Sequence, residues 1–206
     1  MSAKPRSART ARHAVRITRQ RVAAAMAASP RRAHLPREQW DYADEDNPLP
    51  LFNQQTSSQP STVATMLHLL NVPEGARVLD VGAGSGWTTA ILAHLTGSDG
   101  SVLGIELDPE LAQWGADNLA NIQRPWVRIE PARPGVLGAP EHGPYDRILV
   151  SAMASVLPRE LVAQLVIGGL MVIPVAGEMH RVIRDSEVEF RSRSFGKYRF
   201  VPLITD

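Results

Sequence analysis

Apolar residues follow two alternating spacings along the chain from Ser61 onward. Short β-branched runs, such as "ARVLDVGA" and "SVLGIEL", alternate with segments whose apolar residues recur every three or four positions. The first spacing indicates strands and the second indicates amphipathic helices. We therefore expect strands at 76–83, 101–107, 126–130, 145–152 and 168–176, with helices at 62–70, 87–95, 109–122 and 158–166.

Strands separated by helices of this length need crossover connections, which produce a parallel sheet with helices packed on it. The tail differs, because residues 180–204 show strand-like alternation with no helix between them. This pattern predicts antiparallel strands at one edge of the sheet. The expected fold class is α/β, with a doubly wound, mostly parallel, Rossmann-like sheet that ends in antiparallel C-terminal edge strands.

The N-terminal part of the chain does not show this alternation of strand and helix patterns. A helix fits residues 15–28, "SPRRAHLP" breaks it, and a polar, proline-dotted connection follows over 37–60. We divide the chain into a basic arm at 1–14, expected to be disordered, an N-terminal helix with a connecting segment at 15–60, and the main domain at 61–206.

The connection ends in "QTSSQP", a cluster of hydroxyl side chains just before an expected helix. Ser and Thr side chains accept hydrogen bonds from the unpaired N–H groups of a helix's first turn, and Pro suits the entry. Ser61, directly before "TVATMLHLL", is the expected cap. Ser58 is then free to contact a substrate.

A glycine loop, Gly82 to Gly86 with Trp87 after it, joins the first strand of the main domain to its helix. Such a loop exposes backbone N–H groups to a ligand at a helix N-terminus. The dinucleotide fingerprint requires glycine where Trp87 stands, which disfavours a nicotinamide-dependent oxidoreductase. Asp80 and Glu106 instead offer carboxylates for the ammonium group and the ribose of S-adenosylmethionine. The alternative is a simple tight turn with Glu106 as a surface acid.

Composition narrows the function classes further. The chain has 206 residues, 44% of them hydrophobic, and a formal net charge of +1, which fits one sizeable core. Cysteine is absent, which excludes disulfides, thiolate nucleophiles and Cys-ligated zinc. The histidines show no ligand spacing, so we expect no metal site.

No apolar run approaches the roughly 18 residues of a membrane span, and no signal peptide is evident, so we expect a cytosolic protein without a membrane partner.

Basic residues gather between Lys4 and Arg21 with no acid among them. One interpretation is a solvated arm that leads into the first helix. The other is contact with nucleic-acid phosphates. No aromatic residue interleaves with the arginines, so base stacking has no support and a nucleic-acid partner is disfavoured.

The chain resembles the protein-L-isoaspartate (D-aspartate) O-methyltransferase family in several segments at once. "QTSSQPSTVATM" is similar to that family's Q-T-I-S-Q-P segment, "VLDVGAGSGWTTAILA" to its first cofactor motif, and "GIELDPEL" to its ribose-binding motif. "PYDRILVSAM", "LPRELVAQLVIGGLMVIPV" and "YRFVPL" match in the same order. The resemblance covers nearly the whole chain from about residue 15.

This resemblance implies an enzyme that uses S-adenosyl-L-methionine, releases S-adenosyl-L-homocysteine and needs no metal. It implies that Ser58 is the active-site serine beside the transferred methyl group and the substrate carboxylate. The implied substrate contacts are Gln59, Val201 and Pro202. The implied cofactor contacts are Thr56, Ser57, Asp80, Gly82, Ala83, Gly84, Gly86, Glu106 and Leu107.

The chain departs from the family pattern at several positions. Ser57 stands where the family has Ile, Ser61 where it has a larger residue, and Gln54 where it has Gly. Ala132-Arg133-Pro134 replaces a G-D-G segment whose aspartate reaches the adenine amino group in the family. Arginine has no acceptor for that amine and proline lacks a backbone donor. Either other groups hold adenine, such as Glu130 or a backbone carbonyl, or the cofactor binds weakly.

We expect methyl transfer to a peptide or protein carboxylate, the α-carboxyl of L-isoaspartyl residues in ordinary members of the family, as a step of protein repair. Methyl transfer to an ionised carboxylate needs alignment and exclusion of water rather than a general base. A second possibility is a relative that methylates one particular peptide. A third is a cofactor-deficient binding protein with the same fold. We expect a monomer.

Overall fold

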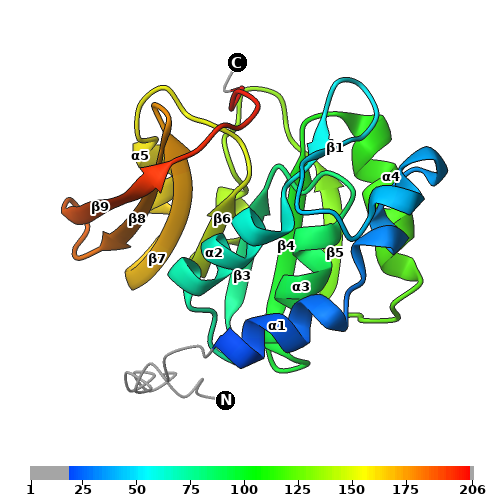
Figure 1. The fold of residues 1–206 in the computed structure, drawn as a ribbon. Helices are drawn as coiled ribbons and strands as arrows, with labels where there is room; N and C mark the ends of the chain where they lie inside the picture. Colours follow the sequence, from blue (N-terminus) through cyan, green and yellow to red (C-terminus); the bar gives the residue numbers. More distant parts are fainter. Residues whose placement is uncertain (1–18, 205–206) are drawn as a thin grey trace, which may run out of the picture.

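The computed structural model describes residues 19–204, so the expected basic arm and the start of the expected first helix lie outside the described residues. The main-domain helices and strands occur in the predicted order (Figure 1). The α-helices are α1 (Arg19–Ala27), α2 (Pro60–Leu70), α3 (Trp87–Thr96), α4 (Pro109–Ala120) and α5 (Arg159–Ala163). Short 3-10 helices are η1 (Arg31–His34), η2 (Arg37–Tyr42) and η3 (Pro140–His142).

The strands form one large sheet and one small one. The large sheet has the order β5-β4-β3-β6-β7-β8-β9, and β1 pairs with β2 separately. The bounds are β1 (Leu49–Pro50), β2 (Thr56–Ser57), β3 (Arg77–Val81), β4 (Ser101–Glu106), β5 (Val127–Pro131), β6 (Tyr145–Val150), β7 (Leu165–Val175), β8 (Glu178–Arg184) and β9 (Phe190–Lys197).

Strands β3 to β7 run parallel, whereas β8 and β9 are antiparallel to their neighbours, which confirms the expected mixed sheet. The chain moves outward from β3 to β4 and β5, then returns to place β6 on the other side of β3. This reversal opens a crevice at the carboxyl ends of β3, β4 and β6, where α/β sheets bind ligands.

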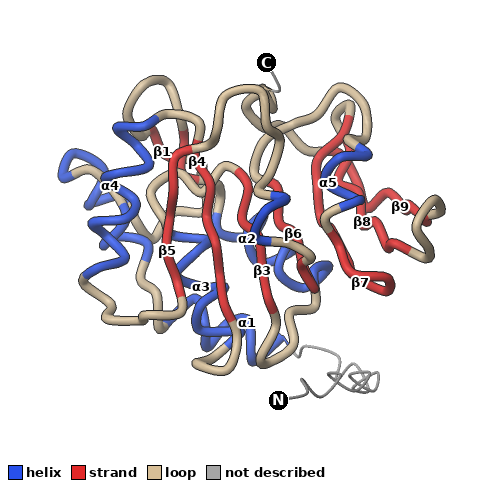
Figure 2. The backbone as a smooth tube through the Cα atoms, turned by 180° about the vertical axis from the view of Figure 1, so that it is seen from behind, coloured by secondary structure: helices blue, strands red, loops and turns tan. Residues whose placement is uncertain are grey.

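Side chains on the central strands alternate between two cores, because successive residues of a strand face opposite sides of the sheet. Val78, Val102 and Leu149 face α1, α2 and α3, while Leu79 and Ile148 face the side of α5. Figure 2 shows the sheet from behind, with α1, α2 and α3 on its far side. Burial on both faces explains why these strands are continuous apolar runs rather than alternating ones.

The start of α4 follows its sequence signature. Pro109 takes the first helical position, as predicted, and Asp108 precedes it as the cap. The Asp108 carboxylate accepts hydrogen bonds from the N–H groups of Glu110 at 2.9 Å and Leu111 at 3.1 Å. Local chemistry therefore sets this helix start and, with it, the end of β4.

The predicted helix at 158–166 is wrong at its end. Helix α5 stops at Ala163, and β7 already begins at Leu165, which pairs with Tyr145 of β6. The apolar pattern runs through this junction without a glycine or proline, so periodicity gave no boundary. Pairing with β6 decides it, since the Tyr145 N–H donates to the Gln164 carbonyl at 2.8 Å.

The predicted cap of α2 is also wrong. Helix α2 begins at Pro60, so Ser61 lies inside the first turn and Gln59 takes the cap position without a side-chain cap bond. The Ser61 N–H instead donates to the Asp46 carboxylate at 2.8 Å. Since α2 starts two residues earlier than expected, a hydroxyl at 61 cannot reach the orphan N–H groups as a cap does.

The described helices include none that is long and apolar enough to cross a membrane. The expected connection at 37–60 contains η2 and the β1–β2 hairpin, neither of which the sequence pattern indicated. This hairpin brings "QTSSQP" back over the carboxyl ends of the parallel strands (Figure 1).

Candidate active site

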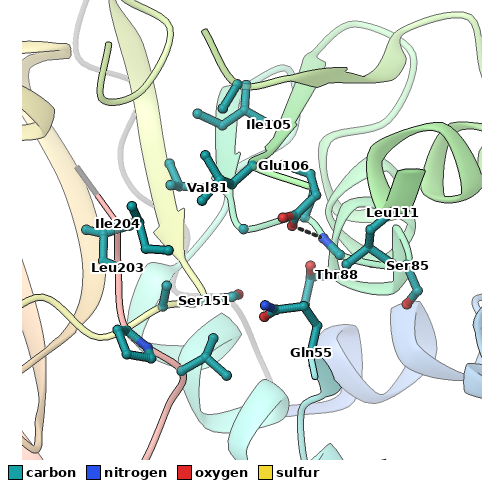
Figure 3. Close-up of a pocket in the computed structure, with 18 of the residues that line it drawn as sticks. Gln55, Val81, Ser85, Thr88, Ile105, Glu106, Leu111, Ser151, Leu203 and Ile204 are labelled. Carbon is teal, nitrogen blue, oxygen red and sulfur yellow. Dashed lines mark hydrogen bonds between the residues drawn. The ribbon is translucent and has the colours of Figure 1, made fainter. Parts of the chain in front are cut away.

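A cavity lies at the crevice between β3, β4 and β6, and segments far apart in the sequence line it (Figure 3). Gln55, Glu106 and Ser151 approach it from three of these segments. The lining comes from the hydroxyl loop at 55–58, the glycine loop at 82–85, residues 105–107, the segment 132–138, the turn at 151–152 and the tail at 201–204. Most of the predicted site residues therefore meet in one place.

The glycine loop has the backbone shape that its sequence predicts. Gly82, Gly84 and Gly86 all have positive φ, at 76°, 54° and 81°. At Gly86 a side chain would also collide with α4, because an added Cβ would lie 2.9 Å from the carbonyl oxygen of Gly115. Gly86 thus permits close packing of the loop against α4, while Gly82, Ala83 and Gly84 line the cavity.

Two side chains hold the loop from outside. The carbonyl of Ser85 accepts hydrogen bonds from Asn118 of α4 at 3.0 Å and from His34 of η1 at 3.1 Å. His34 is buried, and burial lowers its pKa. Because a carbonyl only accepts, His34 donates through Nδ1–H. The pKa lowered by burial keeps the ring neutral near pH 7.

Glu106 stands at the end of β4 with its carboxylate at the cavity wall. One oxygen accepts the Gly84 N–H at 2.9 Å, and the other accepts the Asp108 N–H at 3.1 Å. Carboxylates can accept further bonds at each oxygen, so ligand hydroxyls can still be bound there. Leu107, half exposed at 50%, lines the cavity next to it.

Asp80 lies behind the loop rather than at the cavity surface. It is fully buried, and its Oδ2 accepts hydrogen bonds from the hydroxyls of Thr88 at 2.8 Å and Thr89 at 2.7 Å. Burial raises the pKa of Asp80 to about 6, the two hydroxyls oppose this shift, and the charge of Glu106 adds to it. Its Oδ1 has no partner among the described residues. A buried acceptor of this kind is suited to a cation held directly or through water.

The hydroxyl loop presents Thr56, Ser57 and Ser58 to the cavity, but Gln59 does not line it. The Gln59 amide donates to Asp46 at 3.0 Å instead. Ser57 is buried, and its hydroxyl accepts a hydrogen bond from Arg31 at 3.1 Å.

Gln54, which occupies a glycine position of the family pattern, has φ of 62°. This left-handed conformation explains why glycine suits the position.

Residues 132–134 line the cavity beside Glu106, and the Ala132 N–H donates to the Glu106 carbonyl at 2.7 Å. The guanidinium of Arg133 is bound to Glu141 at 2.6 Å. Glu130, the expected alternative acceptor for adenine, is not among the cavity residues and pairs with Arg128 at 2.5 Å. Acceptors on this side of the cavity are therefore backbone carbonyls.

The C-terminal tail closes another part of the cavity. Val201 and Pro202, the implied substrate contacts, line the cavity together with Leu203 and Ile204. Met153 fixes this tail, because its N–H donates to the Val201 carbonyl at 2.7 Å and its carbonyl accepts from the Leu203 N–H at 2.8 Å. The tail is thus tied to the turn after β6.

Sequence reasoning missed several cavity residues. Gln55, Ser151 and Ala152 line the cavity, and so does the segment 135–138. The position of Ser151 and Ala152 directly after a parallel strand was a usable signal, because the carboxyl ends of such strands meet at one edge. Residues 135–138 carry no such signal.

Comparisons with known proteins decide the family. The family model described as "Protein-L-isoaspartate(D-aspartate) O-methyltransferase (PCMT)" matches residues 8–206. The chain belongs to this family. Among its relatives, the protein-L-isoaspartate O-methyltransferase of Methanococcoides burtonii is 39% identical over 190 residues, 91% of this chain and 93% of that protein. The enzyme of that name from Methanopyrus kandleri is 42% identical over 192 residues, covering 91% of this chain and 85% of its own length.

A solved family structure shows the same fold. A Plasmodium falciparum protein of this type, crystallised with S-adenosyl-L-homocysteine, superposes with a TM-score of 0.81 at 24% identity. The superposition covers 92% of this chain and 93% of that one. The match therefore includes the N-terminal segment and the C-terminal tail as well as the central sheet.

Proposed function

We propose that this chain transfers a methyl group from S-adenosyl-L-methionine to the α-carboxyl of L-isoaspartyl residues in peptides and proteins, a step of protein repair. The observation that carries the proposal is one cavity lined by both the glycine loop with Glu106 and the hydroxyl loop with Ser58. A site of this kind can hold a methyl donor and a carboxylate acceptor together.

The donor side fits the cofactor. Glu106 retains acceptor capacity for ribose hydroxyls, and the unpartnered oxygen of Asp80 suits an ammonium group. Thr56, Gly82, Ala83, Gly84 and Leu107 line the same wall. With Arg133 bound to Glu141, backbone carbonyls of 132–138 would serve the adenine amino group.

When bound, S-adenosylmethionine supplies an electrophilic methyl group, so that a carboxylate oxygen–carbon bond forms, a carbon–sulfur bond breaks, and its electron pair stays on sulfur. No proton moves, which removes the need for a general base. The residues' task is to orient the acceptor and exclude water. Ser58 would donate one hydrogen bond to the acceptor carboxylate, while Val201 and Pro202 would contact the surrounding peptide.

A second candidate is methylation of one particular peptide. Small hydroxyl residues at 57 and 61, in place of the family's larger ones, would make the entrance roomier or more polar. The Ser57 hydroxyl is bound by Arg31, however, and Ser61 is exposed outside the cavity. These contacts weaken the structural reason for altered specificity. A cytosolic location, a monomeric state and the absence of a nucleic-acid partner stay predictions.

Two measurements test the proposal. Calorimetric titration with S-adenosylhomocysteine should show binding, and absence of binding at millimolar ligand would leave the cofactor-deficient binding protein as the explanation. Methyl transfer should then occur to an isoaspartyl peptide and not to the same peptide with a normal aspartyl residue. Equal rates on both peptides, or none on either, would contradict the isoaspartyl specificity.

A further inference from the structure

Arg31, in η1, makes an unusually dense set of contacts with the hydroxyl loop. Its NH2 group donates to the carbonyls of Ser57 at 3.0 Å and Ser58 at 3.1 Å, and its Nε donates to the Ser57 hydroxyl at 3.1 Å. The same guanidinium donates to the carbonyls of Asn47 at 2.9 Å and Glu45 at 3.2 Å. One side chain thus ties the loop that carries Ser58 to the segment before β1.

The charge of Arg31 is buried without a direct ion pair. The residue is 5% exposed, and no carboxylate of residues 19–204 forms a salt bridge with it. Asp46 attracts it from a longer range, while burial lowers the pKa of Arg31 to about 10, so it is positively charged at neutral pH. Carbonyl dipoles and the Trp87 ring, whose centroid is 5.3 Å from the guanidinium carbon, surround the charge.

The guanidinium lies behind the part of the cavity wall that carries Ser58, the residue expected to contact the acceptor. Ser57, Ser58 and Trp87, which all contact Arg31, also line the cavity. A positive charge behind a partly desolvated wall is weakly screened, so it attracts an anion placed on the other side of that wall. The planar guanidinium meanwhile binds the Ser57 hydroxyl through Nε and the Ser57 and Ser58 carbonyls through Nη2. A lysine carries all its donors on one nitrogen, so it cannot span these groups in the same way.

We propose that Arg31 is a positioning residue for the acceptor carboxylate: it fixes the Ser57–Ser58 backbone and supplies the positive charge that makes the site prefer an anionic acceptor. This inference rests on the proposed methyltransferase function. Ser57 takes part as the hydroxyl partner of Arg31, which gives the serine at this position a role that the family's isoleucine could not fill.

The test compares Arg31→Met and Arg31→Lys with Arg32→Met, a matched control. Arg32 is the exposed neighbour of Arg31 in the same turn and stacks on Trp40, away from the cavity. For each full-length variant, three quantities are measured: the melting temperature, the dissociation constant of S-adenosylhomocysteine, and kcat/KM for an isoaspartyl peptide. In the presence of S-adenosylhomocysteine, calorimetry also compares that peptide with its neutral α-carboxamide analogue.

Arg31→Met should lower kcat/KM at least tenfold and reduce the acid-over-amide affinity ratio about tenfold, with the S-adenosylhomocysteine affinity within threefold of wild type. Arg31→Lys should keep most of the acid-over-amide affinity ratio, since it keeps the positive charge. It should still lower kcat, because the ammonium group cannot replace the guanidinium's set of hydrogen bonds to the hydroxyl loop. Arg32→Met should match wild type in every quantity.

An unchanged acid-over-amide ratio in Arg31→Met would overturn the inference, as would parallel losses of cofactor and peptide affinity in both variants. If Arg31→Met does not fold, Arg31→Lys decides alone, because wild-type kcat in that variant contradicts a positioning role. If the wild-type protein binds no S-adenosylhomocysteine, the proposed function itself is wrong. Failure of that function is therefore distinguishable from failure of the Arg31 inference.

Discussion

The carboxylate of Asp46 accepts the backbone N–H of Ser61 at 2.8 Å, so the start of α2 is capped from the loop before β1. The same carboxylate accepts the side-chain amide of Gln59 at 3.0 Å, and these bonds lower the pKa of Asp46. One acid therefore fixes both the start of α2 and the end of the hydroxyl loop.

Replacing Asp46 should lower the melting temperature, whereas replacing Ser61 should not. Asp46→Ala removes the acceptor from the first turn of α2, so that the Ser61 N–H must bond to water instead. Ser61→Ala leaves the backbone N–H and its bond to Asp46 intact. Thermal unfolding of the two variants checks this assignment, and an equal or larger loss in Ser61→Ala would restore Ser61 as the cap.

Local chemistry explains which parts of the fold and site the sequence could predict. The start of α4 at Pro109 and the sharp turn of the glycine loop depend on neighbouring residues, and both were predicted. The contact of Arg31 with Ser57 joins residues 26 positions apart, and its existence depends on the path of the intervening chain. No spacing rule encodes such a path.

Two of the predicted site residues do not line the cavity, and the reason is the same for both. Gln59 sits next to Ser58 in the motif, yet its side chain turns to Asp46, because only the fold brings that acid near. Asp80 precedes the glycine loop, but strand alternation points its carboxylate behind the cavity wall, toward Thr88 and Thr89. Motif position thus located the right segments without fixing the direction of each side chain.

Ser58→Ala should slow methyl transfer about ten- to a hundredfold. A hydrogen bond to a charged group is typically worth about 1.5–3 kcal/mol, which corresponds to that change in rate. Ser58 lines the cavity, and the bonds that hold Glu106 to Gly84 and Asp108 do not involve it, so binding of S-adenosylhomocysteine should stay close to wild type. Single-turnover rates with saturating cofactor measure the effect.

Ser61→Ala is the matched control for Ser58, because Ser61 is exposed and does not line the cavity. It removes the same hydroxyl group three positions along the chain and should leave the rate unchanged. A wild-type rate in Ser58→Ala would remove Ser58 from the acceptor site.

Gly86→Ala should destabilise the protein more than Gly177→Ala, in the turn between β7 and β8. Both glycines have positive φ, at 81° and 89°, so alanine is strained at either position by about 1–2 kcal/mol. At Gly177 nothing lies within 4 Å of the added Cβ, whereas at Gly86 the Gly115 carbonyl oxygen would be 2.9 Å away. This overpacking should add about 1–3 kcal/mol.

Urea unfolding of the two glycine variants measures the difference in the free energy of unfolding. Displacement of the loop from α4 should also weaken S-adenosylhomocysteine binding in Gly86→Ala alone. Equal destabilisation of the two variants would show that backbone strain, and not the approach to Gly115, is what requires glycine at 86.

Asp80 should make the stability of the protein fall as pH rises through about 6. Its pKa in the folded protein is raised to about 6 by burial, above the usual value of 3.8. A raised pKa favours folding most at low pH, below the unfolded value, and this contribution is lost as the group ionises in the folded state. Relative to Asp80→Asn, the wild type should lose about 2 kcal/mol of unfolding free energy between pH 4 and pH 7.

Binding of S-adenosylhomocysteine should depend on Asp80 in the opposite direction, because only the ionised carboxylate attracts the ligand's ammonium group. The wild-type affinity should therefore fall as pH drops below about 6, while Asp80→Asn should bind more weakly at pH 7.5 and lack that pH dependence. The variant keeps a carbonyl that can accept from the hydroxyls of Thr88 and Thr89, so the helix start is preserved. Calorimetry at pH 5, 6 and 7.5 on both proteins measures this, and parallel pH profiles would show that Asp80 has no part in holding the cofactor.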